Sequence, residues 1–145
     1  MNKLKVLIVE DENKTQKLFE LALSQDIFKK EFCVSGIDAL TRYEKWKPDI
    51  IILDVYIPDM TGYSILKKIR EDFEDAKTTI IMSSSLKDEE HIKDCIKYGI
   101  QGYIIKPFRY KKIGSEIMKC YQMGEKTIQK VDEAINYKLD SYDMI

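Results

Sequence analysis

The feature that most constrains the fold of this chain is a regular alternation between short apolar runs and amphipathic segments. Short apolar runs that are rich in β-branched residues predict strands. Such runs occupy residues 4–9, 28–34, 49–53, 79–82 and 102–105. Strands that alternate with helices predict a doubly wound α/β fold, a five-stranded parallel sheet with helices on both faces and right-handed crossovers. Lys29 and Lys30 interrupt the second run, which places that strand near an edge.

Helical patterns fill the intervals between these strands. Apolar residues recur at helical spacing in segments near residues 13–23, 37–46, 61–73, 88–98 and 108–121. Leu21 and Ile37 are among the apolar residues that define the first two helical patterns. Asp11 or Asn13 is expected to cap the first helix, and Gly99 to end the fourth.

Length and composition favour one ordinary globular domain. At 145 residues the chain suits a single domain, and its net charge of −1 gives no general attraction to nucleic acid or anionic membranes. No apolar run approaches the roughly 20 residues of a membrane-spanning helix, and no signal-peptide pattern is seen. Cys33, Cys95 and Cys120 are far apart, which predicts buried, reduced thiols and a cytoplasmic location. Thiol catalysis is disfavoured because His91, expected on the surface of a charged helix, is the only histidine.

Polar side chains gather where the predicted strands end. Glu10 and Asp11 follow the first strand, Asp54 ends the third, Ser84 follows the fourth and Lys106 follows the fifth. Parallel strands place their carboxyl ends along one edge of the sheet, where open α/β sheets bind ligands. We therefore expect three carboxylates, a hydroxyl and an ammonium group to converge, with Asp54 as the reacting residue.

This set of groups suits phosphoryl transfer to a carboxylate. Mg2+ or Mn2+ prefers hard oxygen ligands, which Asp11, Asp54 and a backbone carbonyl just beyond Asp54 could supply, with Glu10 reaching the ion through water. With the negative charge offset in this way, an oxygen of Asp54 can attack phosphorus. Lys106 would bind phosphoryl oxygens as a point charge, and Ser84 would donate a hydrogen bond to another.

These residues resemble a known family, the receiver domains of bacterial two-component response regulators. The resemblance rests on Glu10-Asp11, on Asp54 within Leu-Asp-Val-Tyr-Ile-Pro-Asp-Met-Thr-Gly, on Ser84 and on Lys106-Pro107-Phe108. It covers about residues 3–123, and the motifs occur in the family's order at matching separations. It implies a flavodoxin-like topology with strand order 2-1-3-4-5.

The resemblance also implies roles for individual residues. Asp54 would be the phosphorylated residue. Glu10 and Asp11 would be the acidic metal ligands, together with Asp54 and the backbone carbonyl of Tyr56. Lys106, with Ser84, would bind the phosphoryl group. The protein would catalyse its own phosphorylation and dephosphorylation, rather than act as an enzyme on other substrates.

A second group of residues would govern switching and the lifetime of the phosphorylated state. In this family Ser84 would move toward the phosphoryl group, and Tyr103 would turn inward with it. The bulky Tyr56 and Leu86 occupy the positions that tune attack by water, which predicts a phosphoaspartate lasting minutes or longer. Asp59 is expected to be an ordinary loop acid. The backbone-shaping residues of the loops are Pro58, Gly62 and Pro107.

The expected partners also follow from the resemblance. A sensor histidine kinase or a phosphotransfer protein would donate the phosphoryl group, and a downstream output domain or protein would respond to it. The face formed by residues 88–98, 102–105 and 108–121 would change on phosphorylation and could form a homodimer. No helix-turn-helix or other DNA-reading segment is apparent, so direct binding to nucleic acid is not expected.

Residues 124–145 exceed what a receiver needs. We therefore divide the chain into a receiver domain at 1–123 and a C-terminal helical extension or linker at 124–145. Apolar residues recur there at heptad-like spacing, but over too short a length for a coiled-coil prediction. Two interpretations stay open. One is an extension of the last helix that packs on its own domain, or a frayed linker, and the other is a dimerising helix that leads to an output domain.

Two other functions can be weighed against the receiver. A phosphatase of the haloacid-dehalogenase type also uses an aspartate nucleophile after an apolar strand with Mg2+. It needs a second acid two residues later, where this chain has Tyr56. A pseudo-receiver that serves only as a docking module is disfavoured because Asp11, Asp54, Ser84 and Lys106 are all present.

Overall fold

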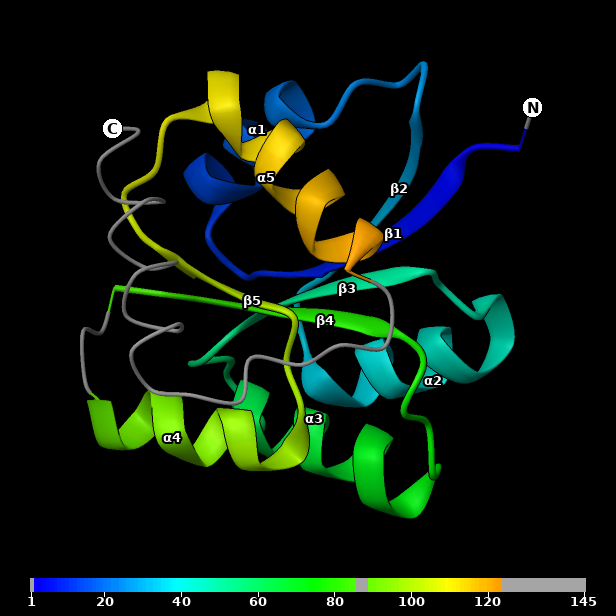
Figure 1. Cartoon of the computed structure of the whole chain (residues 1–145), viewed down its shortest axis with the longest axis vertical. Coiled ribbons are helices and arrows are strands. Elements are labelled where there is room, and N and C mark those ends of the chain that lie inside the picture. The colour runs from blue at the N-terminus through cyan, green and yellow to red at the C-terminus, as the bar shows by residue number, and fades with distance from the viewer. Residues whose placement is uncertain (1, 86–88, 124–145) are drawn as a thin grey trace.

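The computed structural model describes residues 2–85 and 89–123. Its centre is a five-stranded sheet in which neighbouring strands are parallel and the order is β2-β1-β3-β4-β5 (Figure 1). The strands are β1 (Leu4–Val9), β2 (Phe28–Cys33), β3 (Ile50–Asp54), β4 (Thr79–Ser84) and β5 (Gly102–Ile105). The predicted fold class and strand order are confirmed, and β2 lies at an edge, as its lysines indicate.

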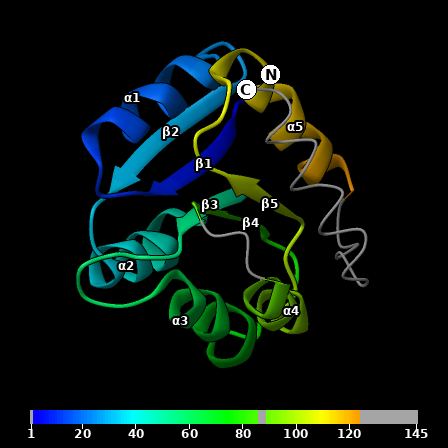
Figure 2. The same cartoon turned by 90° about the vertical axis from the view of Figure 1, so that its left-hand side faces the viewer.

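Helices cover both faces of this sheet. They are α1 (Asn13–Ala22), α2 (Gly36–Trp46), α3 (Gly62–Lys67), the π-helical turn η1 (Lys68–Asp72), α4 (Glu89–Tyr98) and α5 (Tyr110–Gln122). The pair α1 and α5 packs on one face, and α2, α3 and α4 cover the other (Figures 1 and 2). Within residues 2–85 and 89–123, none of these helices has the length and apolar character needed to cross a bilayer. The extension expected at 124–145 and the lifetime-tuning position Leu86 lie outside the described residues.

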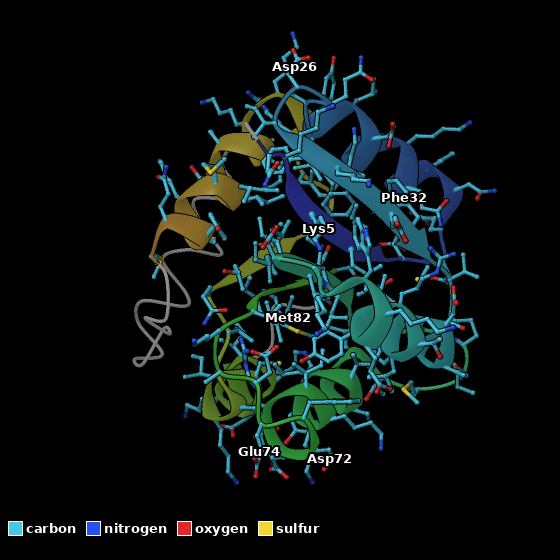
Figure 3. All side chains as sticks on the ribbon, turned by 90° about the vertical axis from the view of Figure 1, so that its right-hand side faces the viewer. Lys5, Asp26, Phe32, Asp72, Glu74 and Met82 are labelled. Atoms are coloured by element: carbon cyan, nitrogen blue, oxygen red, sulfur yellow. The ribbon has the colours of Figure 1, made fainter. Side chains whose placement is uncertain are left out.

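The central strands are buried on both faces, which explains why their sequences are continuously apolar. Every residue of β3 and β4 is buried. Alternate residues enter two separate cores, with Val9 facing the core beneath α2, α3 and α4, and Ile8 facing the core beneath α1 and α5. Figure 3 shows Met82 in the interior, whereas Asp72 and Glu74 project from the surface.

The helix predicted at 61–73 is divided in the structure. Its first part, α3, begins after Thr61, whose hydroxyl accepts a hydrogen bond from the amide of Ser64 at 3.1 Å. It then widens into η1, where the amide of Phe73 donates to the carbonyl of Lys68 at 3.0 Å. That spacing of five residues is the π-helical pattern, which inserts one extra residue into a turn. Apolar periodicity does not distinguish such a turn from an ordinary helix.

Other helix ends also differ from the prediction. The residue before α1 is Glu12, and its side chain makes no capping bond, so the expected caps Asp11 and Asn13 are wrong. The cap of α2 is Ser35, which accepts a hydrogen bond from the amide of Asp38 at 3.2 Å. The last helix begins two residues later than expected, at Tyr110.

Two residues of the predicted apolar patterns lie on the surface. Leu21 and Ile37 are each 66% exposed. Residues two apart on a helix do not share a face, whereas residues four apart do. Phe19 and Leu23 are the buried pair in this part of the chain, so Leu21 between them points outward. Ile37 is likewise two residues from the buried Ala39.

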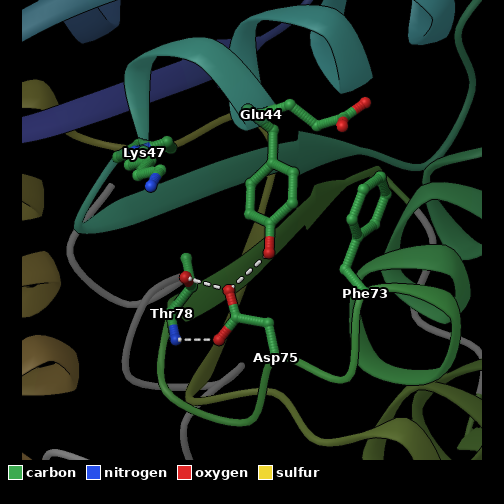
Figure 4. A pocket seen from close by; sticks show the side chains of 7 residues that line it. Glu44, Lys47, Phe73, Asp75 and Thr78 are labelled. Carbon is green, nitrogen blue, oxygen red and sulfur yellow. Dashed lines mark hydrogen bonds between the residues drawn. The ribbon is translucent and has the colours of Figure 1, made fainter.

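A polar network holds the edge of the sheet where β3 and β4 begin. Asp75 accepts hydrogen bonds from the hydroxyl of Tyr43 at 2.6 Å and from the hydroxyl and amide of Thr78 at 2.5 and 3.0 Å (Figure 4). Burial opposes ionisation of Asp75, but these hydrogen bonds prevail and lower its pKa to about 2. A pocket of about 350 Å3 lies beside the network, with Lys47 and Phe73 in its wall.

Arg70 ties the end of α4 to the same edge. Its Nε donates to the carbonyl of Gly99 at 2.9 Å, Nη1 to the carbonyl of Asp75 at 2.9 Å, and Nη2 to Oε1 of Gln101 at 3.1 Å. The same oxygen of Gln101 accepts from the amide of Ile80 at 2.8 Å. Gly99 has a φ of 94°, which suits the glycine predicted to end this helix. The carboxyl end of α4 is therefore joined to the start of β4.

Candidate functional site

Three strand ends supply the charged side chains of the candidate site. Glu10 directly follows β1, Asp54 is the last residue of β3, and Lys106 directly follows β5. In the paired strands β1 and β3, Val9 lies beside Leu53, so the next residues, Glu10 and Asp54, lie at the same edge of the sheet. Nζ of Lys106 reaches them across β4 and lies 2.7 Å from Oε1 of Glu10 and 3.1 Å from Oδ2 of Asp54. The structure thus brings these predicted residues together.

Glu10, Asp11 and Asp54 form a compact group of acids. One carboxylate oxygen from each residue lies within 4.8 Å of the other two, with Glu10 and Asp54 buried and Asp11 exposed. Three carboxylates outweigh the charge of Lys106, and like charges at this range repel one another. Clustered carboxylate oxygens with one side open to solvent are what Mg2+ binding requires. The residues present therefore fit a hard divalent cation.

Burial and hydrogen bonding act in opposite directions on the two contacting groups. Burial raises the pKa of Glu10, and the hydrogen bonds from Lys106 and from the amide of Glu12, at 3.0 Å, offset only part of this effect. Burial opposes the charge of Lys106, but its hydrogen bond to Glu10 and the negative charges of Asp54 and Glu10 prevail and raise its pKa. Lys106 therefore remains a cation throughout the physiological pH range.

Two serines end the strand that lies between Asp54 and Lys106. The predicted phosphoryl-binding residue, Ser84, is buried, and its carbonyl accepts a hydrogen bond from the amide of Lys106 at 2.8 Å. Ser83 pairs in register with Asp54, and its buried hydroxyl has no hydrogen-bond partner among the described residues. Register partners in a sheet share a face, so Ser83 lies on the face of Asp54. The sequence prediction considered Ser84 and missed Ser83.

The loop after Asp54 keeps its backbone close to the carboxylate. The amide of Tyr56 donates to Oδ1 of Asp54 at 3.3 Å, and the amide of Gly62 donates to the carbonyl of Val55 at 2.8 Å. A Cβ atom at Gly62 would lie 2.2 Å from the carbonyl oxygen of Asp54, so any larger residue would clash. The side chain of Tyr56 is 63% exposed, and Pro58 is exposed farther along the loop. Tyr56 therefore contacts Asp54 through its backbone.

An open pocket lies beside the acids, between the start of α1 and the segment after β5. Its volume is about 420 Å3, and its lining includes Glu12, Lys106, Pro107 and Phe108. The peptide bond between Lys106 and Pro107 is cis. The ring of Phe108 packs on Phe19 of α1, with 4.7 Å between ring centroids. A molecule approaching Lys106 from this side would meet a preformed surface.

Tyr103, which is predicted to turn inward on switching, is fully buried. Its ring centroid lies 6.0 Å from that of His91 in an edge-to-face arrangement. His91 is partly buried, so it is less solvated than the sequence predicts. The cause is the packing of its ring beside Tyr103, which helical periodicity does not reveal. The structure therefore describes the inward position of Tyr103.

The cysteines behave as the sequence predicts. Cys33, Cys95 and Cys120 are all buried, and none forms a disulfide within residues 2–85 and 89–123. Sγ of Cys95 lies 3.7 Å from Nε2 of His91, the only histidine in the sequence. Burial raises the pKa of Cys95 to about 12. The thiol stays protonated and is not a nucleophile at neutral pH.

Asp59 is more than an ordinary loop acid. Its carboxylate accepts hydrogen bonds from the amides of Gly36, at 2.7 Å, and Ile37, at 3.0 Å, at the start of α2. Asp59 and Gly36 are 23 positions apart, so no local sequence pattern signals the contact.

Comparison with known sequences agrees with this geometry. A family model described as the response regulator receiver domain matches residues 6–118. The chemotaxis protein CheY of Halobacterium salinarum is 32% identical over 104 residues, which cover 72% of this chain and 85% of that protein. The probable C4-dicarboxylate response regulator DctR of Halalkalibacterium halodurans is 28% identical over 142 residues, or 94% of this chain and 59% of that protein. The chain spans about half the length of the first curated relatives that it matches.

Solved structures give the same result. CheY4 of Vibrio cholerae superposes with a TM-score of 0.75 at 26% identity, covering 82% of this chain and 99% of that one. One chain of the complex of CheX, CheY, BeF3 and Mg2+ from Borrelia burgdorferi matches with a TM-score of 0.74 at 29% identity. The match covers 81% of this chain and 89% of that one. The matched range of the family model runs from β1 into α5 and includes Glu10, Asp11, Asp54 and Lys106. The chain belongs to the response regulator receiver domain family.

Proposed function

We propose that this chain is a phospho-accepting switch in which Asp54 receives a phosphoryl group from a histidine kinase or a phosphotransfer protein. The observation that carries the proposal is the contact of Lys106 with Asp54 at 3.1 Å and with Glu10 at 2.7 Å, inside a cluster of three acids. A fixed ammonium group at this position offsets charge that would otherwise repel an incoming phosphoryl group.

In the proposed reaction an oxygen of Asp54 attacks phosphorus and forms the P–O bond of an acyl phosphate. The P–N bond to the donor histidine breaks, and its electron pair stays on the imidazole nitrogen. Lys106 donates hydrogen bonds to oxygens of the transferred group, and the hydroxyl of Ser84 donates to another. Such a transfer depends almost wholly on positioning and on charge neutralisation.

The acids would hold the divalent ion that this chemistry needs. Asp11, Asp54 and the backbone carbonyl of Tyr56 would supply direct oxygen ligands, with Glu10 at the edge of the site. Bound Mg2+ or Mn2+ would supply positive charge for the carboxylates and for the phosphoryl oxygens. The burial of Glu10 and its hydrogen bond to Lys106 suit an indirect contact through water better than a direct one.

We assign the switching function to residues 1–123 and to a two-state equilibrium that phosphorylation biases. Ser84 and Tyr103 would report the state of Asp54 to the surface formed by α4, β5 and α5. That surface would control a downstream output domain or protein in the cytoplasm, and could form a homodimer. Support comes from Tyr103, which lies in β5 beside His91 of α4 and so links two elements of this surface.

The phosphorylated state should be long-lived. Tyr56 and Leu86 are bulky at the two positions expected to tune attack by water, and we propose a lifetime of minutes or longer for the phosphoaspartate. Measurement of phosphate release from the magnesium-bound phosphoprotein tests this point. Release within seconds would contradict it.

The central experiment is a mass measurement after incubation with Mg2+ and acetyl phosphate. The wild-type chain should gain one phosphoryl group, Asp54→Asn should gain none, and the exposed Asp72→Asn should behave as wild type. An equal gain in Asp54→Asn would place the modification elsewhere and overturn the proposal. Repeated release of phosphate from many phosphate esters would instead favour a phosphatase.

A further inference from the structure

We infer that Asp59 is a positioning residue for the metal site, because it ties the loop that carries Tyr56 to the start of α2. The loop lies between β3 and α3, and so between Asp54 and Gly62. The inference rests on the proposed function, since the carbonyl of Tyr56 is a proposed metal ligand. It adds a residue that lies outside the group of clustered acids.

The base of the loop is closed by contacts between its two ends. The amide of Gly62 donates to the carbonyl of Val55 at 2.8 Å, and Tyr56 pairs with Thr61 in an isolated antiparallel bridge. The amide of Tyr56 also donates to Oδ1 of Asp54 at 3.3 Å. These contacts hold one side of the Tyr56 residue against the phosphoryl acceptor.

The tip of the loop is held by α2. Oδ1 of Asp59 accepts from the amide of Gly36 at 2.7 Å, and Oδ2 accepts from the amide of Ile37 at 3.0 Å. A helix leaves its first amides without internal partners, and its dipole favours a negative charge at that end. The two amides lower the pKa of Asp59, so the carboxylate stays charged at neutral pH. The two hydrogen bonds between Asp59 and the start of α2 are therefore present under physiological conditions.

Met60 adds an apolar contact at the same place. A Cβ atom at Gly36 would lie 2.1 Å from Cγ and 2.5 Å from Sδ of Met60, so this side chain rests directly on the first turn of α2. Met60 is also packed against the core on this side of the sheet. The loop tip is thus held by one polar and one apolar contact with the same helix turn.

A backbone ligand depends on the chain that carries it. A carbonyl group has no side-chain torsions with which to reach an ion, so its peptide must already be in place. A loop released from α2 would have to be ordered when the ion binds, and the lost conformational entropy would weaken binding. We therefore expect the removal of Asp59 to weaken Mg2+ binding without the loss of any proposed ligand.

The test compares Asp59→Ala with Ser35→Ala, because both remove a cap from the same end of α2. The hydroxyl of Ser35 accepts from the amide of Asp38 at 3.2 Å, within the helix end itself. Titration of the full chain with MgCl2 by calorimetry should give a Kd about tenfold higher for Asp59→Ala and within about twofold of wild type for Ser35→Ala. Asp59→Asn should lie between them, since one amide oxygen can replace one of the two contacts.

Amide hydrogen exchange without Mg2+ gives an independent readout. The amides of Tyr56 and Gly62 should exchange faster in Asp59→Ala than in wild type, and at the wild-type rate in Ser35→Ala. A wild-type Kd in Asp59→Ala would overturn the inference. So would an equal loss of affinity in Asp59→Ala and Ser35→Ala, which would point to general weakening of α2. A wild-type protein that binds no Mg2+ would instead overturn the proposed metal site, and the positioning role with it.

Discussion

Nζ of Lys106 lies 3.1 Å from Oδ2 of Asp54, although the two residues are 52 positions apart along the chain. The contact exists because β3 and β5 flank β4 and all three strands run in the same direction. Each strand therefore delivers its last residues to the same edge. The arrangement places the ammonium group of a residue far along the chain beside the carboxylate of Asp54.

Lys106→Met is expected to slow the phosphorylation of Asp54 by acetyl phosphate about 100-fold, the effect of removing one preorganised donor from a developing charge. The rate can be followed by mass spectrometry at a fixed Mg2+ concentration. Lys111→Met, which removes an exposed lysine from α5, is the matched control and should leave the rate unchanged. Equal rates for the two variants would contradict the role of Lys106.

Mg2+ is expected to stabilise the folded chain, because it should bind the clustered acids more tightly than it binds the unfolded chain. A ligand at 100 times its Kd adds about 2.7 kcal/mol to the free energy of unfolding. Urea unfolding with and without MgCl2 measures this gain. Asp11→Asn should lose most of it, and in metal-free buffer should be slightly more stable than wild type because repulsion is relieved. Asp26→Asn, in an exposed turn, is the control and should gain as much unfolding free energy from Mg2+ as wild type. A full gain in Asp11→Asn would exclude Asp11 as a ligand.

Asp75 is expected to make stability sensitive to acid. Its pKa falls from 3.8 to about 2 on folding, so the folded state holds the proton less firmly than the unfolded chain does. The contribution is therefore complete above about pH 5 and is lost as the pH falls through 3.8 toward 2. Asp75→Asn should lower the free energy of unfolding at neutral pH by about 1 kcal/mol, a value reduced for partial exposure.

Urea unfolding between neutral pH and about pH 3 checks this prediction, because the difference between Asp75→Asn and wild type should shrink as the pH falls. Asp72→Asn is the control, since Asp72 is exposed and pairs only loosely with Lys68 at 3.7 Å. A constant difference across the pH range would show that Asp75 does not stabilise the fold through its charge.

Ser83→Ala is expected to raise the free energy of unfolding by about 1 kcal/mol, because it removes a buried hydroxyl that no described residue satisfies. The buried Thr15 provides the contrast, since its hydroxyl donates to Glu12. Thr15→Val should therefore lower the free energy of unfolding by about the same amount. Thermal unfolding of both variants tests the pair, and destabilisation by Ser83→Ala would mean that this hydroxyl is satisfied in solution.

The strand ends could be predicted because each is marked locally. Glu10, Asp54 and Lys106 all stand at the point where an apolar run stops, and a parallel sheet brings such points together. The strand order followed only from the resemblance to receiver domains, and the direct contact of Lys106 with Glu10 was not predicted. The predicted edge position of β2 had the same kind of local signal, in its two lysines.

Residues whose positions depend on pairing between distant segments could not be predicted. Asp59 reads as a loop acid until α2 is seen to start beside it, and Ser83 reads as part of a serine run until its register with Asp54 is known. His91 was predicted to be a surface residue, and only the placement of Tyr103 shows that its ring is partly covered. The turn η1 was missed because α3 and η1 are only six and five residues long, too short for the apolar pattern to reveal one inserted residue.

The bond from Arg70 to the carbonyl of Gly99 has a mechanical consequence for α4. A helix that is held at one end can rotate about that end but cannot translate along its axis. Ser84 is the last residue of β4 and precedes the amino end of α4 in the chain. The hydrogen bond from Arg70 is at the carboxyl end of that helix. A shift that begins at Ser84 would therefore rotate α4 about Gly99, and the displacement of the backbone would be greatest near Glu89 and least near Tyr98.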